Sequence, residues 1–179
     1  MNQVLKRFLK DKKVAALAPT SKFAVRKICE HINFSRNLFF VEYGPGDGVL
    51  SKEVLSRMTL ESSFVGIETN ANFVRELQTI ADPRLKIVHD SAENICKIIS
   101  GPADFVFSSI PCTFLSPSAR RNLVRDTYNI LAPGGSFIVF QYSPLMKNYL
   151  EEVFGEVKLS IVPLNVPTMF IMAAHKIPR

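Results

Sequence analysis

Three glycines alternate with other residues directly after an apolar run, at Gly44, Gly46 and Gly48. Glycine in such a place lets the backbone take conformations that other residues avoid, and it lets a ligand approach the main chain closely. A dinucleotide-binding G-x-G-x-x-G turn would need its third glycine at position 49, where Val49 stands. The Gly-Lys-Ser/Thr of a phosphate-binding loop is absent as well. The spacing therefore predicts a turn that approaches another kind of ligand, or a tight turn without one.

Polar side chains stand at the ends of three successive apolar runs. Glu42 lies just before the glycines, and Glu68 closes the second run, where a carboxylate can accept hydrogen bonds from both ribose hydroxyls of an adenosine. Asp90 and Ser91 follow the third run and are well placed for an adenine amino group. Three polar strand ends in register favour an adenosine-bearing ligand over an empty turn.

The elements that must position these residues alternate along the chain. Apolar runs typical of strands lie at 38–43, 63–68, 85–88, 104–109 and 135–141. Helical patterns separate or follow them, near 48–58, 70–80, 91–99, 117–131 and 144–154. Such alternation implies crossover units and a parallel sheet with helices on both faces. Two last runs, 156–162 and 169–175, are joined by a link too short for a helical crossover. We therefore predict an α/β fold with a seven-stranded, mostly parallel sheet and one antiparallel strand.

Composition limits the classes of protein that fit. The chain has 179 residues, 47% of them apolar and 21% charged, as expected for one globular domain with a single core. No apolar run approaches the ~20 residues of a membrane span. Cys29, Cys96 and Cys112 match no metal-ligand spacing, and the first residues lack the pattern of a secretory signal. These features predict a protein of the reducing cytoplasm without a metal site.

The first thirteen residues are strongly basic. Their basic side chains, against the single Asp11, are Lys6, Arg7, Lys10, Lys12 and Lys13. An apolar stripe at helical spacing runs between them, formed by Val4, Leu5, Phe8 and Leu9. This pattern is typical of a helix that lies in a membrane interface, but a first helix packed on the domain would show it too. The segment Ala18–Ser21 interrupts this helix and supplies cap residues for a second one that runs to about Asn33.

Several segments resemble a known family. Residues 41–48 look like the first motif of class I S-adenosylmethionine-dependent methyltransferases, and residues 131–135 are similar to the turn before the fifth strand of those enzymes. Within the class, two groups are closest: the bacterial phospholipid N-methyltransferases and the ribosomal RNA adenine dimethyltransferases. The likeness to the first group covers most of the chain and includes the segments Ala18–Ser21, Gly66–Asn70, Ser108–Pro111 and Asn165–Pro167.

The resemblance implies a Rossmann-like methyltransferase fold with S-adenosyl-L-methionine as cofactor and S-adenosyl-L-homocysteine as product. Residues 1–33 would form N-terminal helices, and residues 34–179 would form the methyltransferase domain. The cofactor-binding residues that it implies are Glu42, Gly44, Gly46, Gly48, Glu68, Thr69, Asp90, Ser91, Ala92 and Ser108. Asp90-Ser91 stands where the family tends to have Gly-Asp, so either residue is a candidate for the adenine contact.

The segment Ser108–Cys112 separates the two groups. Adenine methyltransferases of RNA and DNA carry Asn/Asp-x-Pro-Tyr/Phe, whose polar group accepts from the exocyclic amine and whose aromatic ring stacks on a flipped base. This chain has Ser109 in place of the amide and Cys112 in place of the ring. The Ser-x-x-Pro form resembles the phospholipid enzymes, which implies N-methylation of a head-group amine such as that of phosphatidylethanolamine. The anionic inner face of a membrane would then be the partner of a monomeric, peripherally bound enzyme.

Methyl transfer is an in-line displacement, so the enzyme mainly positions the reactants, and an amine acceptor must also lose a proton. The catalytic candidates near the strand ends are Tyr142 and Ser109, with His89 as a third. Phe114 and Tyr43 could face a cationic head group, although aromatic residues at such positions also serve as packing residues.

Two other functions remain open at this point. An RNA adenine or small-molecule methyltransferase would share every cofactor motif. A non-catalytic RNA-binding relative would keep the fold and the net charge of +6, which favours a polyanionic partner. The altered Ser108–Cys112 segment favours the lipid over nucleic acid.

Overall fold

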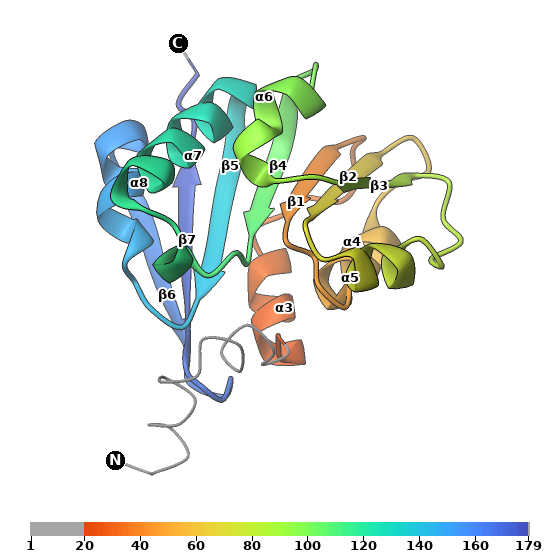
Figure 1. Ribbon diagram of the computed structural model, residues 1–179, viewed down its shortest axis with the longest axis horizontal. Helices are drawn as coiled ribbons and strands as arrows, with labels where there is room; N and C mark the ends of the chain where they lie inside the picture. The colour runs from red at the N-terminus through yellow and green to blue at the C-terminus, as the bar shows by residue number, and fades with distance from the viewer. Residues whose placement is uncertain (1–19, 179) are drawn as a thin grey trace.

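The computed structural model describes residues 20–178, and within them a seven-stranded sheet forms the centre of the molecule (Figure 1). Its strands are β1 (Phe39–Tyr43), β2 (Ser63–Glu68), β3 (Leu85–His89), β4 (Ala103–Ser108), β5 (Leu131–Gln141), β6 (Val157–Val162) and β7 (Met169–His175). The strand order is β3-β2-β1-β4-β5-β7-β6. Strand β7 runs antiparallel to both β5 and β6, while the other neighbouring pairs are parallel. The predicted sheet with one reversed strand is confirmed.

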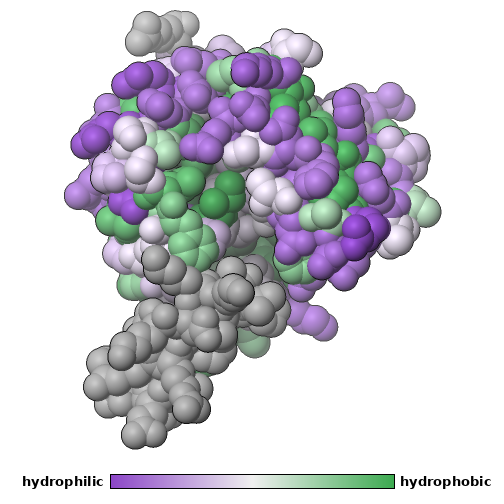
Figure 2. Space-filling view, in the orientation of Figure 1, coloured by the Kyte–Doolittle hydropathy of each residue, from purple (hydrophilic) through white to green (hydrophobic). Residues whose placement is uncertain are grey.

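Helices cover both faces of the sheet. Those of the described chain are α3 (Lys22–Cys29), α4 (Val49–Arg57), α5 (Ala71–Leu77), α6 (Ile95–Ile98), α7 (Pro117–Ile130) and α8 (Met146–Phe154), with 3₁₀ turns η1 (Ala92–Asn94) and η2 (Cys112–Phe114). The single core expected from composition is divided into two clusters by the sheet. Helices α3 and α4 bury their apolar sides in one cluster, and α6, α7 and α8 bury theirs in the other. Polar residues cover most of the face in Figure 2, and apolar residues gather toward its middle.

Three boundaries differ from the predicted ones. Ser21 caps α3 as expected, but the helix ends at Cys29 rather than near Asn33, whose side chain accepts from the amide of Ser35 at 3.1 Å and so favours a turn. The helix predicted over 91–99 is divided into η1 and α6. Strand β5 begins at Leu131, before the expected start, because a register shift in its pairing with β4 accommodates the Pro-Gly-Gly segment.

The basic helix predicted over residues 2–13 and the residues Ala18 and Pro19 lie outside the described part of the chain. Among the helices of residues 20–178, none has the length and apolar character that crossing a membrane requires. The described chain begins at Thr20, next to the N-cap of α3.

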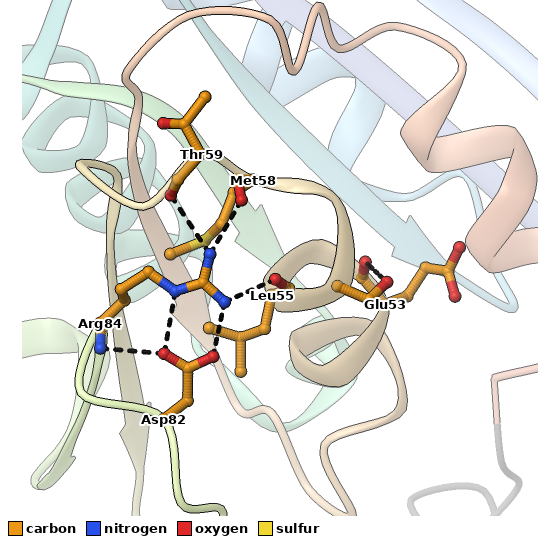
Figure 3. Close-up of polar contacts among 7 residues, drawn as sticks. Glu53, Leu55, Met58, Thr59, Asp82 and Arg84 are labelled. Carbon is orange, nitrogen blue, oxygen red and sulfur yellow. Dashed lines mark hydrogen bonds and ion pairs between the residues drawn. The ribbon is translucent and has the colours of Figure 1, made fainter.

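A partly buried ion pair fixes helix α4 (Figure 3). Arg84 donates to Asp82 through Nε at 2.9 Å and through Nη2 at 2.6 Å. The same guanidinium donates to three carbonyl oxygens at the carboxyl end of α4, those of Leu55, Met58 and Thr59, at 2.8, 2.8 and 3.2 Å. The bonded guanidinium holds the pKa of Asp82 below its usual range. These contacts satisfy carbonyls that a helix end leaves unpaired, and they anchor the helix whose other end carries the glycine turn.

The sheet reverses its order between β1 and β4, because the chain moves outward from β1 in one direction and from β4 in the other. In open parallel sheets ligands bind beyond the carboxyl ends of the strands at such a switch point. Here the loops that leave β1 and β4 contain Gly44–Gly48 and Ser109–Ser116. We call this edge of the sheet the site edge.

Candidate active site

All three glycines of the turn after β1 have positive φ, at 69°, 57° and 75° for Gly44, Gly46 and Gly48. Two of them differ in their surroundings. A Cβ on Gly48 would lie 2.8 Å from Cδ2 of Leu77, so a larger residue there would force the buried Leu77 side chain to shift. A Cβ on Gly46 would meet no atom within 4 Å. The backbone of Gly46 therefore lies next to open space that a ligand can enter.

Glu68 lies at the carboxyl end of β2 with 7% of its surface exposed. Its Oε2 accepts from the amide of Gly46 at 3.2 Å, and its Oε1 accepts from the amide of Asn70 at 2.8 Å. A carboxylate oxygen has two lone pairs, so each oxygen can accept one further hydrogen bond. The structure thus brings the predicted ribose acceptor against the predicted glycine turn.

Asp90 follows β3 on the same edge. Its Oδ1 accepts from Asn94 Nδ2 at 2.8 Å and from the amide of Ser91 at 2.6 Å, and these bonds lower the pKa of the carboxyl. Among the described residues no donor contacts Oδ2, which leaves that oxygen for an amino group. Ser91 instead caps η1 through Oγ, Ala92 is buried, and Thr69 is exposed beside the end of β2. The geometry therefore favours Asp90 over Ser91 as an acceptor for adenine.

Glu42 lies under the glycine turn, not at its surface. It is 2% exposed, and Ser51 of α4 donates to its Oε2 at 2.5 Å. Burial raises its pKa to about 7, the hydroxyl of Ser51 opposes this rise, and the charges of Asp47 and Glu68 add to it. The carboxyl thus joins β1 to the first turn of α4, which supports the turn from the inside.

The loop after β4 lies against the same turn. Ser109 Oγ donates to the carbonyl of Gly44 at 2.6 Å, and the neighbouring Ser108 is buried opposite Tyr43 in the sheet. From β5, Gln141 Nε2 donates to the carbonyl of Ile110 at 2.5 Å. These bonds hold the β4 loop between the glycine turn and the end of β5.

Tyr142 directly follows β5 and is half-buried. Burial raises the pKa of its phenol, although a side-chain hydrogen bond with Asn165 opposes the rise. The phenol is therefore protonated at neutral pH. Tyr142 can orient an acceptor by hydrogen bonding, but it does not provide a ready phenolate base.

Two of the predicted aromatic and basic candidates, Tyr43 and His89, are not placed for the roles predicted for them. Tyr43 is fully buried and its hydroxyl lies 3.1 Å from Oγ1 of Thr127, so the prediction that it faces a head group is wrong. His89 ends the edge strand β3, where Nε2 contacts the carbonyl of Thr69 at 3.1 Å. Three strand spacings, roughly 14 Å, separate β3 from β4, so His89 is not beside Ser109. Phe114 is 48% exposed in η2, on the site edge.

Sequence reasoning gave no role to Asn165, which is 1% exposed in the β6–β7 loop. Its Oδ1 accepts from the amide of Ser21 at 2.9 Å, and its Nδ2 donates to the carbonyl of Pro167 at 2.7 Å. With its bond to Tyr142, it links the start of α3, the end of β5 and its own loop. The sequence feature that could have indicated this role is the position of Asn165 between two prolines in a short link. An Asn side chain in such a place often forms hydrogen bonds with the backbone.

These residues suit an adenosine-bearing cation. The turn offers open space at Gly46, Glu68 has acceptors for two hydroxyls, and the carboxylates of Glu68 and Asp90 attract positive charge. Together with the strand order, they define the protein as a methyltransferase dependent on S-adenosyl-L-methionine.

Comparison with known proteins identifies the family. Residues 40–135 match the family model described as a methyltransferase domain, and the chain belongs to this family. The chain is 26% identical over 161 residues to the ornithine lipid N-methyltransferase of Singulisphaera acidiphila. The aligned region covers 86% of this chain and 84% of that protein.

Solved structures show the same fold. The precorrin-6y C5,15-methyltransferase of Geobacter metallireducens superposes with a TM-score of 0.72 at 15% identity, over 89% of this chain and 90% of that one. A spermidine synthase in complex with the transition-state analogue AdoDATO gives a TM-score of 0.67 at 15% identity, over 87% of this chain and 59% of that one.

Proposed function

We propose that this methyltransferase N-methylates the head-group amine of a membrane lipid, such as phosphatidylethanolamine or an amino lipid of similar charge. The observation that carries the proposal is the state of the loop after β4. Cys112 is 2% exposed and has no aromatic ring to stack on a base, and Ser109 offers a single hydroxyl oxygen where the adenine enzymes carry an amide or a carboxylate. The similarity to an enzyme named as an ornithine lipid N-methyltransferase supports the same acceptor class.

The residues have separable roles in this proposal. The cofactor supplies a methyl group on a sulfonium when it is bound. The carboxylates of Glu68 and Asp90 would hold its adenosine part, and the open space beside Gly46 would let it approach the turn. Ser109 and Tyr142 would orient the acceptor amine, which loses its proton to water before attack because the Tyr142 phenol stays protonated. The enzyme would act as a monomer at the cytoplasmic face of the membrane.

The test offers the purified protein isotopically labelled S-adenosyl-L-methionine with three acceptors in parallel. These are phosphatidylethanolamine in detergent micelles, an ornithine-containing lipid in the same micelles, and unmethylated ribosomal RNA. Mass spectrometry should find label in a lipid amine and none in RNA. The Glu68→Ala protein is the control for cofactor-dependent transfer. Labelled RNA with unlabelled lipid would contradict the proposal, and failure to bind S-adenosyl-L-homocysteine would favour a non-catalytic relative.

A further inference from the structure

Large apolar side chains are exposed on three loops of the site edge. Their exposed fractions are 48% for Phe114, 38% for Leu145, 65% for Leu164 and 85% for Val166. Phe114 lies between β4 and α7, Leu145 between β5 and α8, and the other two lie between β6 and β7. Strand β6 runs in the same direction as β5, so its loop to β7 emerges on the site edge as well. We call these four residues the apolar rim.

The loops that carry the apolar rim are joined to one another. Gln141 links the β4–α7 loop to the end of β5 through the carbonyl of Ile110. Asn165 stands between Leu164 and Val166 and bonds to Tyr142 and to the amide of Ser21. Figure 2 shows apolar residues gathered over the segment that leads from β4 into α7. Side-chain bonds therefore tie the three loops that carry the rim to one another around the acceptor side of the site.

Charge divides the site edge into two halves. The segments 20–23, 109–116, 142–145 and 163–168 contain no Asp or Glu, and Lys22 among them is exposed. The cofactor half, in contrast, carries carboxylates, including Asp47, Glu68, Asp90 and Glu93. Residues 6–13 contain five Lys or Arg against one Asp, and the chain that carries them enters the described structure at Thr20, beside Asn165. An apolar surface without acidic groups, in a chain whose first thirteen residues are basic, has the chemistry that binds anionic lipid.

We propose that the apolar rim docks on the surface of an anionic lipid bilayer, with Leu164 and Val166 of the β6–β7 loop entering the interface. This inference rests on the proposed lipid acceptor and adds a membrane contact that is separate from the basic segment. It places Ser109 and Tyr142 toward the bilayer, so a head-group amine reaches the site without leaving the membrane. Cofactor enters by the acidic half of the edge.

The chain contains no tryptophan, which allows a direct test. Single tryptophans are introduced by Val166→Trp and Leu164→Trp. Matched controls are Leu60→Trp and Ile177→Trp, at residues 85% and 70% exposed on the opposite edge, before β2 and after β7. Cofactor-free proteins are mixed with vesicles of equal parts phosphatidylglycerol and phosphatidylcholine. The rim tryptophans should shift their emission to the blue and be quenched by brominated lipid, and the controls should show neither effect.

The double variant Leu164→Ser/Val166→Ser provides a second measurement. Its affinity for these vesicles in co-sedimentation should fall about tenfold or more, because two apolar side chains lose their burial. Its affinity for S-adenosyl-L-homocysteine should be unchanged. Equal shifts at all four tryptophans, no shift at the rim, or unchanged co-sedimentation of the double variant would overturn the proposal. Insertion at the rim without lipid methylation would contradict the proposed acceptor alone, and lipid methylation in micelles without insertion would contradict the docking alone.

Discussion

The amide of Gly46 donates to Oε2 of Glu68 at 3.2 Å, which joins the turn after β1 to the carboxyl end of β2. The same carboxylate accepts from Asn70 through its other oxygen, so its position is fixed before any ligand binds. A fixed acceptor loses little conformational entropy on binding. This pair is therefore the part of the site whose change gives the sharpest predictions for the cofactor.

Glu68→Ala should weaken binding of S-adenosyl-L-homocysteine by about 100-fold or more, because the hydrogen bonds expected from the two ribose hydroxyls to the carboxylate are lost. Calorimetric titration measures the affinity, and circular dichroism shows whether the variant is folded. The control is Glu61→Ala, at an exposed carboxylate before β2 on the opposite edge, which should leave the affinity unchanged. Wild-type affinity in a folded Glu68→Ala protein would refute this assignment.

Gly46→Val should abolish binding of the cofactor while the domain stays folded, because the side chain fills the open space beside the turn. The positive φ of 57° adds a conformational cost of roughly 1–2 kcal/mol or more. Gly134→Val is the matched control, since Gly134 also has positive φ and open space but lies on the opposite edge. Both variants should melt at similarly lowered temperatures, and only the first should lose the ligand. Loss of binding in both would indicate a general effect of unfolding.

Glu42→Gln should change how stability depends on pH. Burial raises the pKa of Glu42 from 4.5 to about 7, so the folded state binds more protons than the unfolded state between these values. The corresponding stability is fully present below pH 4.5 and is lost as pH rises to about 7, a change on the order of 3 kcal/mol. Urea unfolding at a series of pH values should show a flatter profile for the variant. Identical profiles for the two proteins would contradict a protonated Glu42.

Tyr142→Phe should lower kcat for the lipid acceptor about tenfold and leave the shape of the pH–rate profile unchanged. The reason is that the raised pKa keeps the phenol protonated, so its loss removes a hydrogen bond rather than a titrating base. Tyr128→Phe, at a half-buried tyrosine on the opposite edge, serves as the control. If the variant lost a limb of the profile that wild type shows, Tyr142 would be the base after all.

Arg84→Lys should destabilise the fold by roughly 1–3 kcal/mol, because an ammonium group keeps the charge but cannot replace the planar guanidinium that bonds Asp82 and the end of α4. Chemical denaturation measures this loss. Arg57→Lys is a suitable comparison, since Arg57 forms an exposed pair with Glu53 and its replacement should cost less than about 0.5 kcal/mol. Equal small losses would mean that the Arg84 contacts do not anchor the helix.

The sequence by itself determined the fold class, and it predicted the main elements of the candidate cofactor site. Alternating apolar runs and helical patterns are local signals, and the short link after residue 162 is enough to reverse the last strand. The glycine spacing and the carboxylate that closes β2 could be recognised for the same reason. Each depends on residues close in sequence to the element that positions them.

Only the tertiary structure decided which face each side chain occupies and which loops meet. Strand β1 is buried on both faces, so its residues show no alternation that could have placed Tyr43 in the core. The bond between Ser21 and Asn165 joins residues 144 positions apart, and no local pattern predicts such a contact. The same is true of the apolar rim, whose loops come together because strand order, not sequence order, sets the neighbours along the sheet edge.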